Sequence, residues 1–303
     1  MSEYKKAIVV YLDDNPKIDV EFSWLWKTWK LYSLEDEFDL VVYHPKEAKE
    51  RVAKYYDIQT IEMPNIRKSD EYPFLNSHYF CLPEWSKPLE KYKYIFKTDC
   101  DVFLTENIKN YTPSKLLVGQ GGYYHIDDEN KTKYIRNLSK ELGFKYRNLP
   151  LIGASMFGGR VDITTLVREQ AYLTEDILEK YSKTKEFIDS GFHIGISSMI
   201  AGQLVVNNYL HHQYISLYCI DSKCWEETKI GSDIIHIHAW HTDLRWSKHQ
   251  FFKGEYKDWD VTLEDAFKNS ANYCQFIAKL SIDDLNKYKE MYAKGELPID
   301  YDY

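Results

Sequence analysis

The sequence predicts an α/β protein with a central mixed sheet flanked by helices and a helical tail at its C-terminal end. Over the first hundred residues, short apolar runs alternate with helical patterns, the order that produces an open and mostly parallel sheet. From residue 262 onward, helical patterns continue without a strand signal. The 303 residues are 44% hydrophobic and contain no internal repeat, low-complexity segment or clear linker, so one core is expected.

Four strands are expected in the first hundred residues, at 6–12, 39–43, 58–62 and 94–96. The run KAIVVYL is apolar throughout, which is typical of strands buried on both faces. Between the strands, residues 20–34 place large apolar side chains at helical spacing, and residues 46–56 are rich in lysine and glutamate. Residues 74–82 lie between Pro73 and Pro83. These three segments are predicted as helices.

The second half of the chain has a more irregular pattern. Further strands are expected at 115–123, 152–158 and 233–239, the last with polar and apolar residues alternating at period two. Long helical patterns cover residues 161–182, 194–209 and 262–293. We expect a main domain at residues 1–255 and a helical extension at 256–303 packed on it.

The composition argues against several classes of protein. The 39 lysine and arginine residues against 47 aspartate and glutamate residues give a net charge of −8, which argues against a nucleic-acid binder. The five cysteines form no CxxC pair, so a reducing compartment is favoured over a disulfide framework. No run approaches 18 apolar residues, and the first apolar run is too short for a secretory signal. We therefore expect a cytoplasmic protein without a membrane span.

Asp99 and Asp101 form an Asp-x-Asp motif directly after the strand at 94–96. Two carboxylates at this spacing can reach one Mn²⁺ or Mg²⁺ ion, which takes oxygen ligands and shares them with substrate phosphates. A solvated acidic turn is the alternative. A metal site is favoured because an apolar strand should not deliver two uncompensated carboxylates beside a core. Open α/β sheets also bind ligands beyond the carboxyl ends of their strands, where Asp13 is expected too.

Three histidines, His236, His238 and His241, lie within six residues. Period-two alternation places His236 and His238 on one face of a strand and isoleucines on the other. A metal or phosphate contact is one hypothesis, and a strand with two hydrogen-bonded histidines is the other. Metallo-hydrolases use a similar spacing, but they usually carry an aspartate where this chain has Trp240.

Two further segments are candidates for ligand contact. GASMFGG, at 153–159, places small residues at a strand end, which allows a ligand near the backbone or a tightly packed central strand. Arg245 and Lys248 follow the histidines and can neutralise a diphosphate or lie in a solvated loop. Neither segment decides the function by itself.

The order of these features resembles that in the GT-A fold glycosyltransferases, which have a Rossmann-like nucleotide-binding half and use nucleotide-sugar donors. YIFKTDCDVFL is similar to their DxD segment, and GASMFGG resembles a small-residue strand of the blood-group and α-galactosyl transferases. In the glycogenin-like and lipopolysaccharide galactosyltransferase families, a metal-binding histidine precedes a tryptophan by eight residues, as His238 precedes Trp246. The resemblance covers residues 5–250 and implies a nucleotide-binding half at about 1–105 and a second half at about 106–255.

The resemblance implies transfer of a sugar from a nucleoside diphosphate sugar, with a UDP-sugar favoured over a GDP-sugar, to a glycan or sugar acceptor. Asp99, Asp101 and His238 would bind Mn²⁺ or Mg²⁺, with His241 as the competing histidine. The residues implied in donor binding are Tyr11, Asp13, Lys97, Asp99 and Lys248. Aromatic residues that could stack on the acceptor are Trp240, Trp246, Tyr123 and Tyr124.

The catalytic group is not given by any motif. Retaining families often have an acidic or amide residue at the head of the helix that corresponds to HIGISSM, where this chain has glycine and serine. Asp189, just before this segment, and Gln203, further along it, are the candidates, with Asp189 as the base of an inverting reaction. GASMFGG favours a retaining reaction, in which the leaving phosphate can accept the proton.

Three alternatives are distinguishable from this hypothesis. A metal-dependent hydrolase would gather His236, His238 and His241 on one metal without Asp101. A nucleotidyltransferase usually has a glycine-rich loop where this chain has LDDNPKID. A non-catalytic glycan-binding protein would show no metal-dependent binding of nucleotides.

Overall fold

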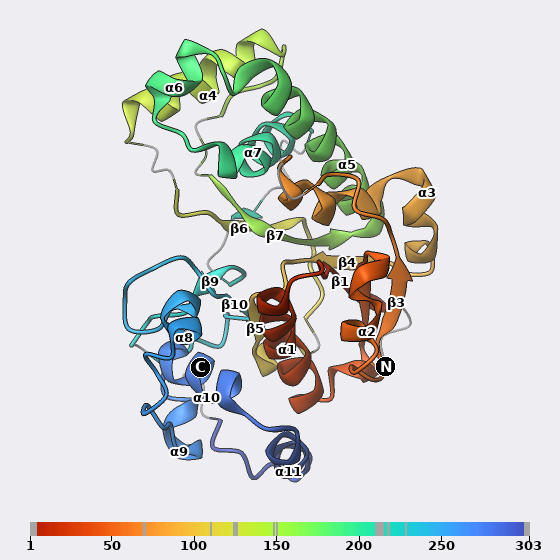
Figure 1. Ribbon diagram of the computed structural model, residues 1–303, viewed down its shortest axis with the longest axis vertical. Coiled ribbons are helices and arrows are strands. Elements are labelled where there is room, and N and C mark those ends of the chain that lie inside the picture. The colour runs from red at the N-terminus through yellow and green to blue at the C-terminus, as the bar shows by residue number, and fades with distance from the viewer. Residues whose placement is uncertain are drawn as a thin grey trace.

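A seven-stranded sheet crosses the middle of the molecule (Figure 1). The structure, a computed structural model, describes residues 5–68, 71–109, 111–123, 127–147, 149, 151–209, 215–216, 219–227 and 229–299. The strands of this sheet are β1 (Lys6–Tyr11), β2 (Phe38–His44), β3 (Gln59–Glu62), β4 (Tyr94–Lys97), β6 (Leu117–Gln120), β7 (Ile152–Gly159) and β8 (Ile215–Ser216). Their order across the sheet is β3-β2-β1-β4-β7-β6-β8.

Parallel and antiparallel pairs are combined in this sheet. Strand β1 pairs in parallel with both β2 and β4, so that Val9 lies opposite Val41 on one side and Lys97 on the other. Strand β2 also pairs in parallel with β3, whereas β7 runs antiparallel to β4 and β6. The predicted α/β fold with a mixed sheet is therefore confirmed, and the arrangement is compatible with a Rossmann-like fold.

A second sheet of three short strands lies below the first in Figure 1. It contains β5 (Val102–Leu104), β10 (His236–His238) and β9 (Ser222–Lys223), in that order. Strand β10 runs antiparallel to β5 and places His238 opposite Val102. Strand pairing thus places the segment that follows the acidic pair directly beside the strand that carries His236 and His238.

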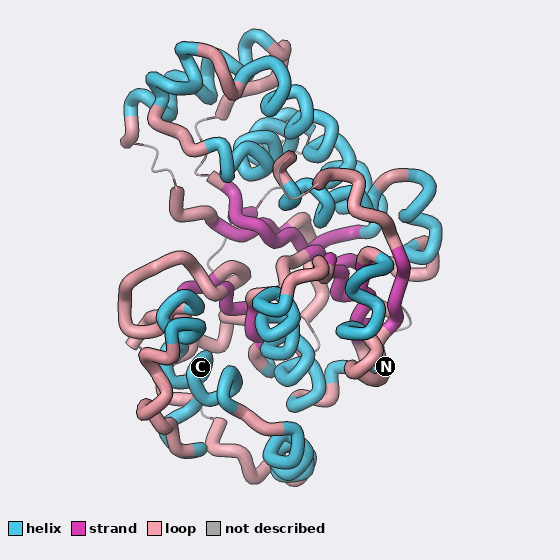
Figure 2. Tube along the Cα trace, in the orientation of Figure 1, coloured by secondary structure: helices cyan, strands magenta, loops and turns pink. Residues whose placement is uncertain are grey.

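Helices pack on both sides of the main sheet (Figure 2). Those on the upper side in Figure 1 are α4 (Glu129–Glu141), α5 (Arg160–Asp176), α6 (Lys185–Ser190) and α7 (Ser197–Tyr209). Those on the lower side are α1 (Pro16–Leu31), α8 (Lys248–Lys253), α9 (Leu263–Ala266), α10 (Ser270–Lys279) and α11 (Ile282–Ala293). The short helices α2 (Lys49–Val52) and α3 (Pro83–Ser86) lie near β3. Of the helices in the described residues, none is long and apolar enough to span a bilayer.

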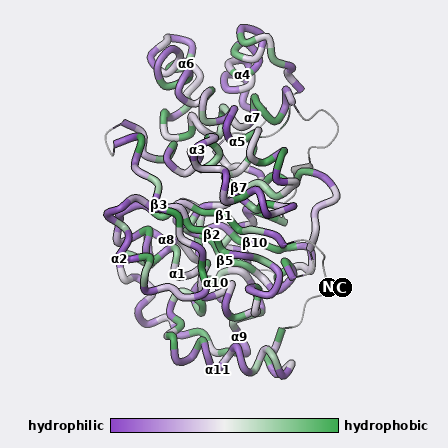
Figure 3. The backbone as a smooth tube through the Cα atoms, turned by 90° about the vertical axis from the view of Figure 1, so that its right-hand side faces the viewer, coloured by the Kyte–Doolittle hydropathy of each residue, from purple (hydrophilic) through white to green (hydrophobic). Residues whose placement is uncertain are grey.

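Each face of the main sheet has its own apolar core. Ile8 and Val10 of β1 contribute to the core that contains α1, whereas Ala7 and Val9 contribute to the core that contains α5 and α7. This burial on both faces explains why the first apolar run has no polar interruption. Figure 3 shows the hydrophobic colour gathered in the strands at the middle of the molecule.

Some predicted elements differ from the observed ones at their ends or in kind. The first helix begins at Pro16, earlier than expected, because the Asn15 side chain accepts a hydrogen bond from the Lys17 amide and proline suits the first helical position. The segment predicted as a helix at 74–82 is a 3₁₀ helix, Pro73–Cys81. Helix α4 was not predicted, although Asp128 caps its start by accepting from the Lys131 amide.

The C-terminal helices share the core of α1. The Tyr32 hydroxyl of the segment after α1 donates to the Tyr273 hydroxyl of α10 at 3.0 Å. Lys27 of α1 is buried and donates to the carbonyls of Ile277 and Ala278 at the end of α10, both at 3.3 Å. The helical C-terminal segment therefore packs directly on the main domain.

The Asp39 carboxylate of β2 links the start of this strand to neighbouring segments, and its contribution to stability can be tested. Its carboxylate accepts hydrogen bonds from Lys5 at 3.1 Å, Gln59 at 2.6 Å and Tyr92 at 2.7 Å. Burial alone would raise the pKa of Asp39, but the bonds from Tyr92 and Lys5 outweigh it and lower the pKa. Because the folded pKa is depressed, the stabilisation is present above the unfolded pKa of about 3.9 and is lost as the pH falls through the folded value.

We therefore expect Asp39→Asn to lower the free energy of unfolding at pH 7 by about 1.5–3 kcal/mol, the range for hydrogen bonds to charged groups. The difference from the wild type should shrink below about pH 4, where the wild-type carboxyl becomes protonated too. Urea unfolding at pH 7 and in acid measures both values. An equal deficit at both pH values would contradict this interpretation.

Candidate metal centre

Two carboxylates and one imidazole converge where the chain passes from the main sheet to the second sheet. Asp99 and Asp101 lie between β4 and β5, and His238 ends β10. One ligand atom from each of these three side chains lies within 4.8 Å of the others. The structure thus brings together the three residues that the sequence analysis selected as metal ligands, while metal binding itself stays a prediction.

Backbone pairing sets this convergence. Val102 lies opposite His238 in the β5–β10 ladder, and the amide of Ala239 donates to the carbonyl of Asp101 at 2.8 Å. The amide of Thr98 donates to the carbonyl of Val9 at 3.1 Å, which continues the pairing of β4 with β1. The acidic pair therefore starts at the carboxyl edge of the parallel strands, where open α/β sheets bind ligands.

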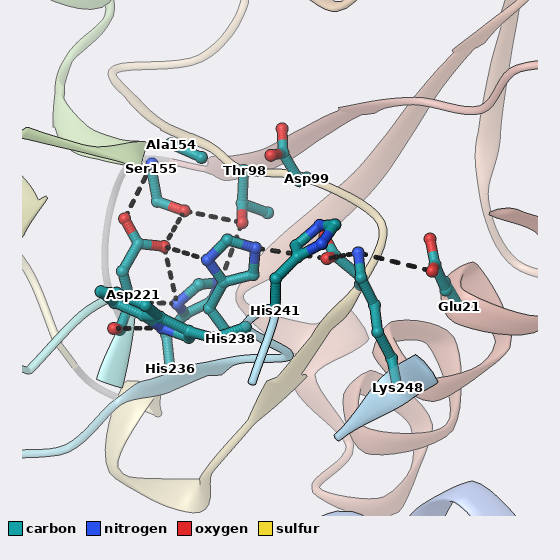
Figure 4. A network of polar contacts seen from close by, with 12 residues as sticks. Glu21, Thr98, Asp99, Ala154, Ser155, Asp221, His236, His238, His241 and Lys248 are labelled. Atoms are coloured by element: carbon teal, nitrogen blue, oxygen red, sulfur yellow. Dashed lines mark hydrogen bonds and ion pairs between the residues drawn. The ribbon is translucent and has the colours of Figure 1, made fainter. Parts of the chain in front are cut away.

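Lys248, the first residue of α8, lies against this cluster (Figure 4). Its Nζ is 2.5 Å from Asp101 Oδ2 and 3.5 Å from Glu21 Oε1. Burial alone would lower the pKa of Lys248, but the charges of Asp101 and Glu21 outweigh it and raise the pKa. Lys248 therefore carries a positive charge beside the acidic pair, which is the property needed to bind a phosphate.

The buried groups around Asp101 shift one another's pKa. Burial alone would raise the pKa of Asp101, but Lys248 and His238 outweigh it and hold the pKa well below its ordinary value. Burial alone would lower the pKa of His238, but Asp101, 3.3 Å from its Nε2, outweighs this effect and raises the pKa to about 9. Burial, with a smaller effect from Asp101, raises the pKa of Glu21 to about 7. Asp101 is thus ionised at neutral pH and can act as an anionic ligand.

The donor set fits a divalent cation. Carboxylate oxygens suit Mn²⁺ and Mg²⁺, and imidazole is a common ligand of transition metals. Asp101 is buried, whereas the Asp99 side chain is 36% exposed, so the site opens to solvent on the side of Asp99. A ligand from solvent can therefore reach the site while Asp101 and His238 keep fixed positions.

Lys97 lies beneath the acidic loop. Its buried ammonium donates to the carbonyl of Ala154 at 2.8 Å and lies 3.4 Å from Asp99 Oδ1. These contacts tie the acidic loop to β7. The expected contact between Lys97 and a donor stays a prediction.

Asp221 is a buried carboxylate that the sequence analysis did not select. It accepts hydrogen bonds from the amide of Ser155 at 3.0 Å and from its hydroxyl at 2.6 Å. Its Oδ1 also lies 3.7 Å from Nδ1 of His236 and 3.8 Å from Nδ1 of His238 (Figure 4). No motif surrounds Asp221 in the sequence, so only the fold reveals that it lies beside the histidines.

His236 faces the protein interior and not the acidic pair. The amide of Asp221 donates to its Nδ1 at 3.0 Å, which places the ring proton on Nε2, 2.8 Å from Oγ1 of Thr98. Burial, with a smaller effect from the charge of His238, lowers the pKa of His236 to about 3. His236 is thus neutral, and it acts as one of the hydrogen-bonded strand histidines considered above.

His241 is not one of the three residues of the metal cluster, although it lies beside it (Figure 4). It is exposed, and its Nδ1 lies 2.7 Å from Nε2 of His249. In the described part of the chain, the candidate metal group consists of Asp99, Asp101 and His238. The three-histidine site expected of a metallo-hydrolase is therefore not formed by these residues.

Tyr11 and Asp13 meet Asn65 at the end of β1. The buried Tyr11 hydroxyl donates to Asn65 Oδ1, and Asn65 Nδ2 donates to Asp13 Oδ1 at 3.2 Å. Burial, with a smaller effect from Asp13, raises the pKa of Tyr11 and keeps the hydroxyl protonated. Asp13 is half-buried and is the more accessible of the two expected nucleotide contacts.

The two catalytic candidates, Asp189 and Gln203, lie away from the cluster, so the structure does not bring them together with the three candidate metal ligands. Asp189 is an exposed residue of α6, which packs against α4 at the far end of the molecule from β5 and β10 (Figure 1). Gln203 of α7 is buried, accepts from the amide of Ile152 at 3.0 Å and donates to the carbonyl of Leu149 at 2.6 Å. Because backbone groups use both of its polar atoms, Gln203 orders the start of β7.

The aromatic residues expected at an acceptor site have different environments. Trp246 is fully buried in the lower core, so the expectation that it stacks on an acceptor is wrong. Trp240 is half-buried, and its Nε1 donates to the carbonyl of Asp221 at 3.1 Å. Tyr123 is exposed, and Tyr124 lies outside the described residues.

The small residues at the start of β7 make room for a side chain of the protein. A Cβ atom on Gly153 would lie 2.0 Å from Asp221 Oδ2, and one on Gly119 of β6 would lie 1.9 Å from the same atom. Glycine is therefore required at both positions for the carboxylate to fit. Of the two hypotheses for this segment, tight packing is the one that the structure supports.

The fold and the cluster together define an α/β protein with an acidic and histidine site at the carboxyl edge of a mixed sheet. A family model described as a domain of unknown function (DUF7164) matches residues 1–294. The chain belongs to this family. A comparison with curated proteins gave no match.

Proposed function

We propose that the protein is a metal-dependent glycosyltransferase that moves a sugar from a nucleoside diphosphate sugar to a glycan or sugar acceptor. The cluster of Asp99, Asp101 and His238, with Lys248 beside it, is the observation that carries this proposal. The order of these residues along the chain resembles that in the GT-A fold glycosyltransferases. The proposal includes a GT-A fold, Mn²⁺ or Mg²⁺ as the metal, and a UDP-sugar in preference to a GDP-sugar.

The residues of the cluster have complementary roles in this proposal. Asp99, Asp101 and His238 would hold the divalent ion, which supplies positive charge against the leaving diphosphate. Lys248 adds a second positive charge, and its contacts with Asp101 and Glu21 fix its position before a substrate arrives. Charges that are already in place stabilise the developing negative charge without reorganisation during the reaction.

The donor would extend from the cluster along the carboxyl edge of the parallel strands. Asp13, at the end of β1, offers a carboxylate for the ribose, and Tyr11 lies beneath it. Lys97 holds Asp99 from below and so sets the position of the acidic loop under the donor. These positions support a nucleotide on the side of β1 and an acceptor on the opposite side of the cluster.

A retaining reaction suits the groups that surround the site. Transfer breaks the bond between the anomeric carbon and the phosphate oxygen of the donor and forms a bond from that carbon to the acceptor oxygen. In the retaining route, the leaving phosphate oxygen accepts the proton of the acceptor hydroxyl. This route requires no protein base, in agreement with the position of Asp189 away from the cluster.

A metal-dependent hydrolase is less well supported by the geometry. Such an enzyme would use His236 and His241 as ligands together with His238. His236 is hydrogen-bonded to Thr98, and His241 lies against His249. One histidine with two carboxylates is the combination that favours the transferase.

Thermal unfolding with nucleotides tests the proposed function. UDP, GDP and their sugars are each added with Mn²⁺ and with EDTA, and UMP serves as a control that lacks the second phosphate. A ligand of the native state stabilises it by about 2.7 kcal/mol when its free concentration is a hundred times Kd. We expect Tm to rise with a UDP ligand and Mn²⁺ and to return to the starting value in EDTA. The absence of a shift with every nucleotide and metal would reject the proposal.

A further inference from the structure

We propose that Asp221 is a positioning residue that orients His238 for metal binding. This inference rests on the metal site of the proposed function. The two ring nitrogens of His238 face opposite carboxylates: Nε2 lies 3.3 Å from Asp101 Oδ2, and Nδ1 lies 3.8 Å from Asp221 Oδ1. In protein metal sites, a ligating histidine commonly directs its second ring nitrogen, as N–H, toward a carboxylate, which fixes the orientation of the ring.

The carboxylate of Asp221 is itself held in one place. Ser155 binds both of its oxygens, one through the amide and one through the hydroxyl. Gly119 and Gly153 line the space around Oδ2 so closely that neither could carry a Cβ atom without a clash. The backbone of Asp221 has a φ of +54°, a conformation that aspartate and asparagine adopt more readily than most residues. Three separate features therefore fix this side chain.

The hydrogen bonds that link His236, Thr98, Ser155 and Asp221 all run from donor to acceptor in the same order. His236 carries its proton on Nε2 and donates to Oγ1 of Thr98, which leaves the Thr98 hydroxyl to donate to Oγ of Ser155 at 2.9 Å. Ser155 in turn donates to Oδ1 of Asp221. Each group in this chain gives its proton toward Asp221, so that Oδ1 stays an acceptor on the side of His238.

Among the residues that the structure describes, one group is available to compensate the charge of Asp221. Within the described residues, its ion-pair contacts are with His236 and His238. His236 already accepts a hydrogen bond at the nitrogen that faces Asp221, so this nitrogen cannot donate. Ser155 gives this buried carboxylate two hydrogen bonds but no positive charge, which leaves Nδ1 of His238 as the group that can compensate its charge. The geometry thus assigns Nε2 of His238 to the metal and Nδ1–H to Asp221.

Binding of Mn²⁺ alone to the metal-free protein tests this assignment, with free Mn²⁺ measured by electron paramagnetic resonance. Asp221→Asn keeps the size of the side chain and tolerates the positive φ, but it removes the charge. We expect its Kd for Mn²⁺ to be about 10–100-fold weaker than that of the wild type, as for other partners of metal-binding histidines. Asp233→Asn is the control: it removes one negative charge from an exposed position between β9 and β10. This variant should bind Mn²⁺ as the wild type does.

Gly153→Ala provides a second variant that leaves every charge in place. Its methyl group would displace the Asp221 carboxylate from His238, so Mn²⁺ binding should weaken in this variant too. In the wild-type protein loaded with Zn²⁺, nitrogen NMR of labelled histidine should show His238 with a proton on Nδ1 and the metal on Nε2. The His238→Gln variant identifies the resonance. This measurement decides the question if either Asp221→Asn or Gly153→Ala fails to fold.

The outcomes separate this inference from the proposed function. If the wild type binds no Mn²⁺, both the metal site and the role of Asp221 are rejected. If the wild type binds Mn²⁺ and Asp221→Asn binds it equally well, the metal site stands and the role of Asp221 is overturned. A proton on Nε2 of His238 in the Zn²⁺-loaded protein would also overturn it.

Discussion

Replacement of Asp101 by Asn is expected to lower the proposed sugar transfer by about 10²–10³-fold, the range for loss of one preorganised electrostatic group in an active site. Asp101 is the buried carboxylate at the centre of the cluster, between His238 and Lys248. An amide of the same shape has no charge to hold a divalent ion, and it leaves Lys248 without its nearest anionic partner. UDP release from a UDP-sugar in the presence of Mn²⁺ measures the effect.

Asp258→Asn is the matched control for this experiment. Asp258 is exposed in the segment between α8 and α9, and its replacement changes the net charge by the same amount. We expect its UDP release to equal that of the wild type. Wild-type turnover by Asp101→Asn would remove Asp101 from the proposed site.

Replacement of Trp246 by Ala is expected to lower the free energy of unfolding by about 3–5 kcal/mol, as for other large aromatic residues in cores. The indole is fully buried, and its Nε1 donates to Oε1 of Gln275 in α10 at 3.1 Å. Its ring also lies edge-on to Trp24 and Phe103, with centroids 5.6 Å and 5.4 Å away. The variant thus loses apolar contacts with α1 and β5 and leaves the Gln275 oxygen without its donor.

Urea unfolding of the same variant compares its stability with that of Trp246→Phe. Phenylalanine keeps most of the apolar contact, so we expect this variant to lose less than half as much stability as the alanine variant. A deficit below about 1 kcal/mol for Trp246→Ala would contradict the role of the indole as a central core residue. Because Trp246 precedes Lys248 by two residues, the alanine variant should also weaken the proposed Mn²⁺-dependent binding of nucleotides.

The part of the site that lies on a strand end could be predicted from the sequence. The short apolar run Tyr94-Ile95-Phe96 marks β4, and the two carboxylates that follow it closely are expected at the edge of the sheet. His238 could be selected because period-two alternation identifies its strand and because its distance from Trp246 resembles that in known families. These patterns involve residues that are close in the sequence, and Asp99, Asp101 and His238 lie together in the structure.

The supporting residues could not be predicted because their roles depend on contacts between distant segments. Asp221 and Ser155 are 66 residues apart, and neither lies in a pattern that suggests a carboxylate site. Gly153 could be noticed in the sequence, but the side chain for which it makes room could not. Gln203 was selected for its chemistry, whereas the structure shows its amide hydrogen-bonded to two backbone groups at the start of β7, contacts that no local pattern reveals.

The pairing of β5 with β10 has a consequence for how the molecule forms. Thr98 and His236 touch although they are 138 residues apart in the chain, so the site depends on closing a very long loop. Contacts of such high sequence separation are slow to form during folding. During synthesis, the acidic pair is therefore complete long before its imidazole partner is made. A chain that stops before β10 would contain both carboxylates and still lack the third member of the candidate metal site.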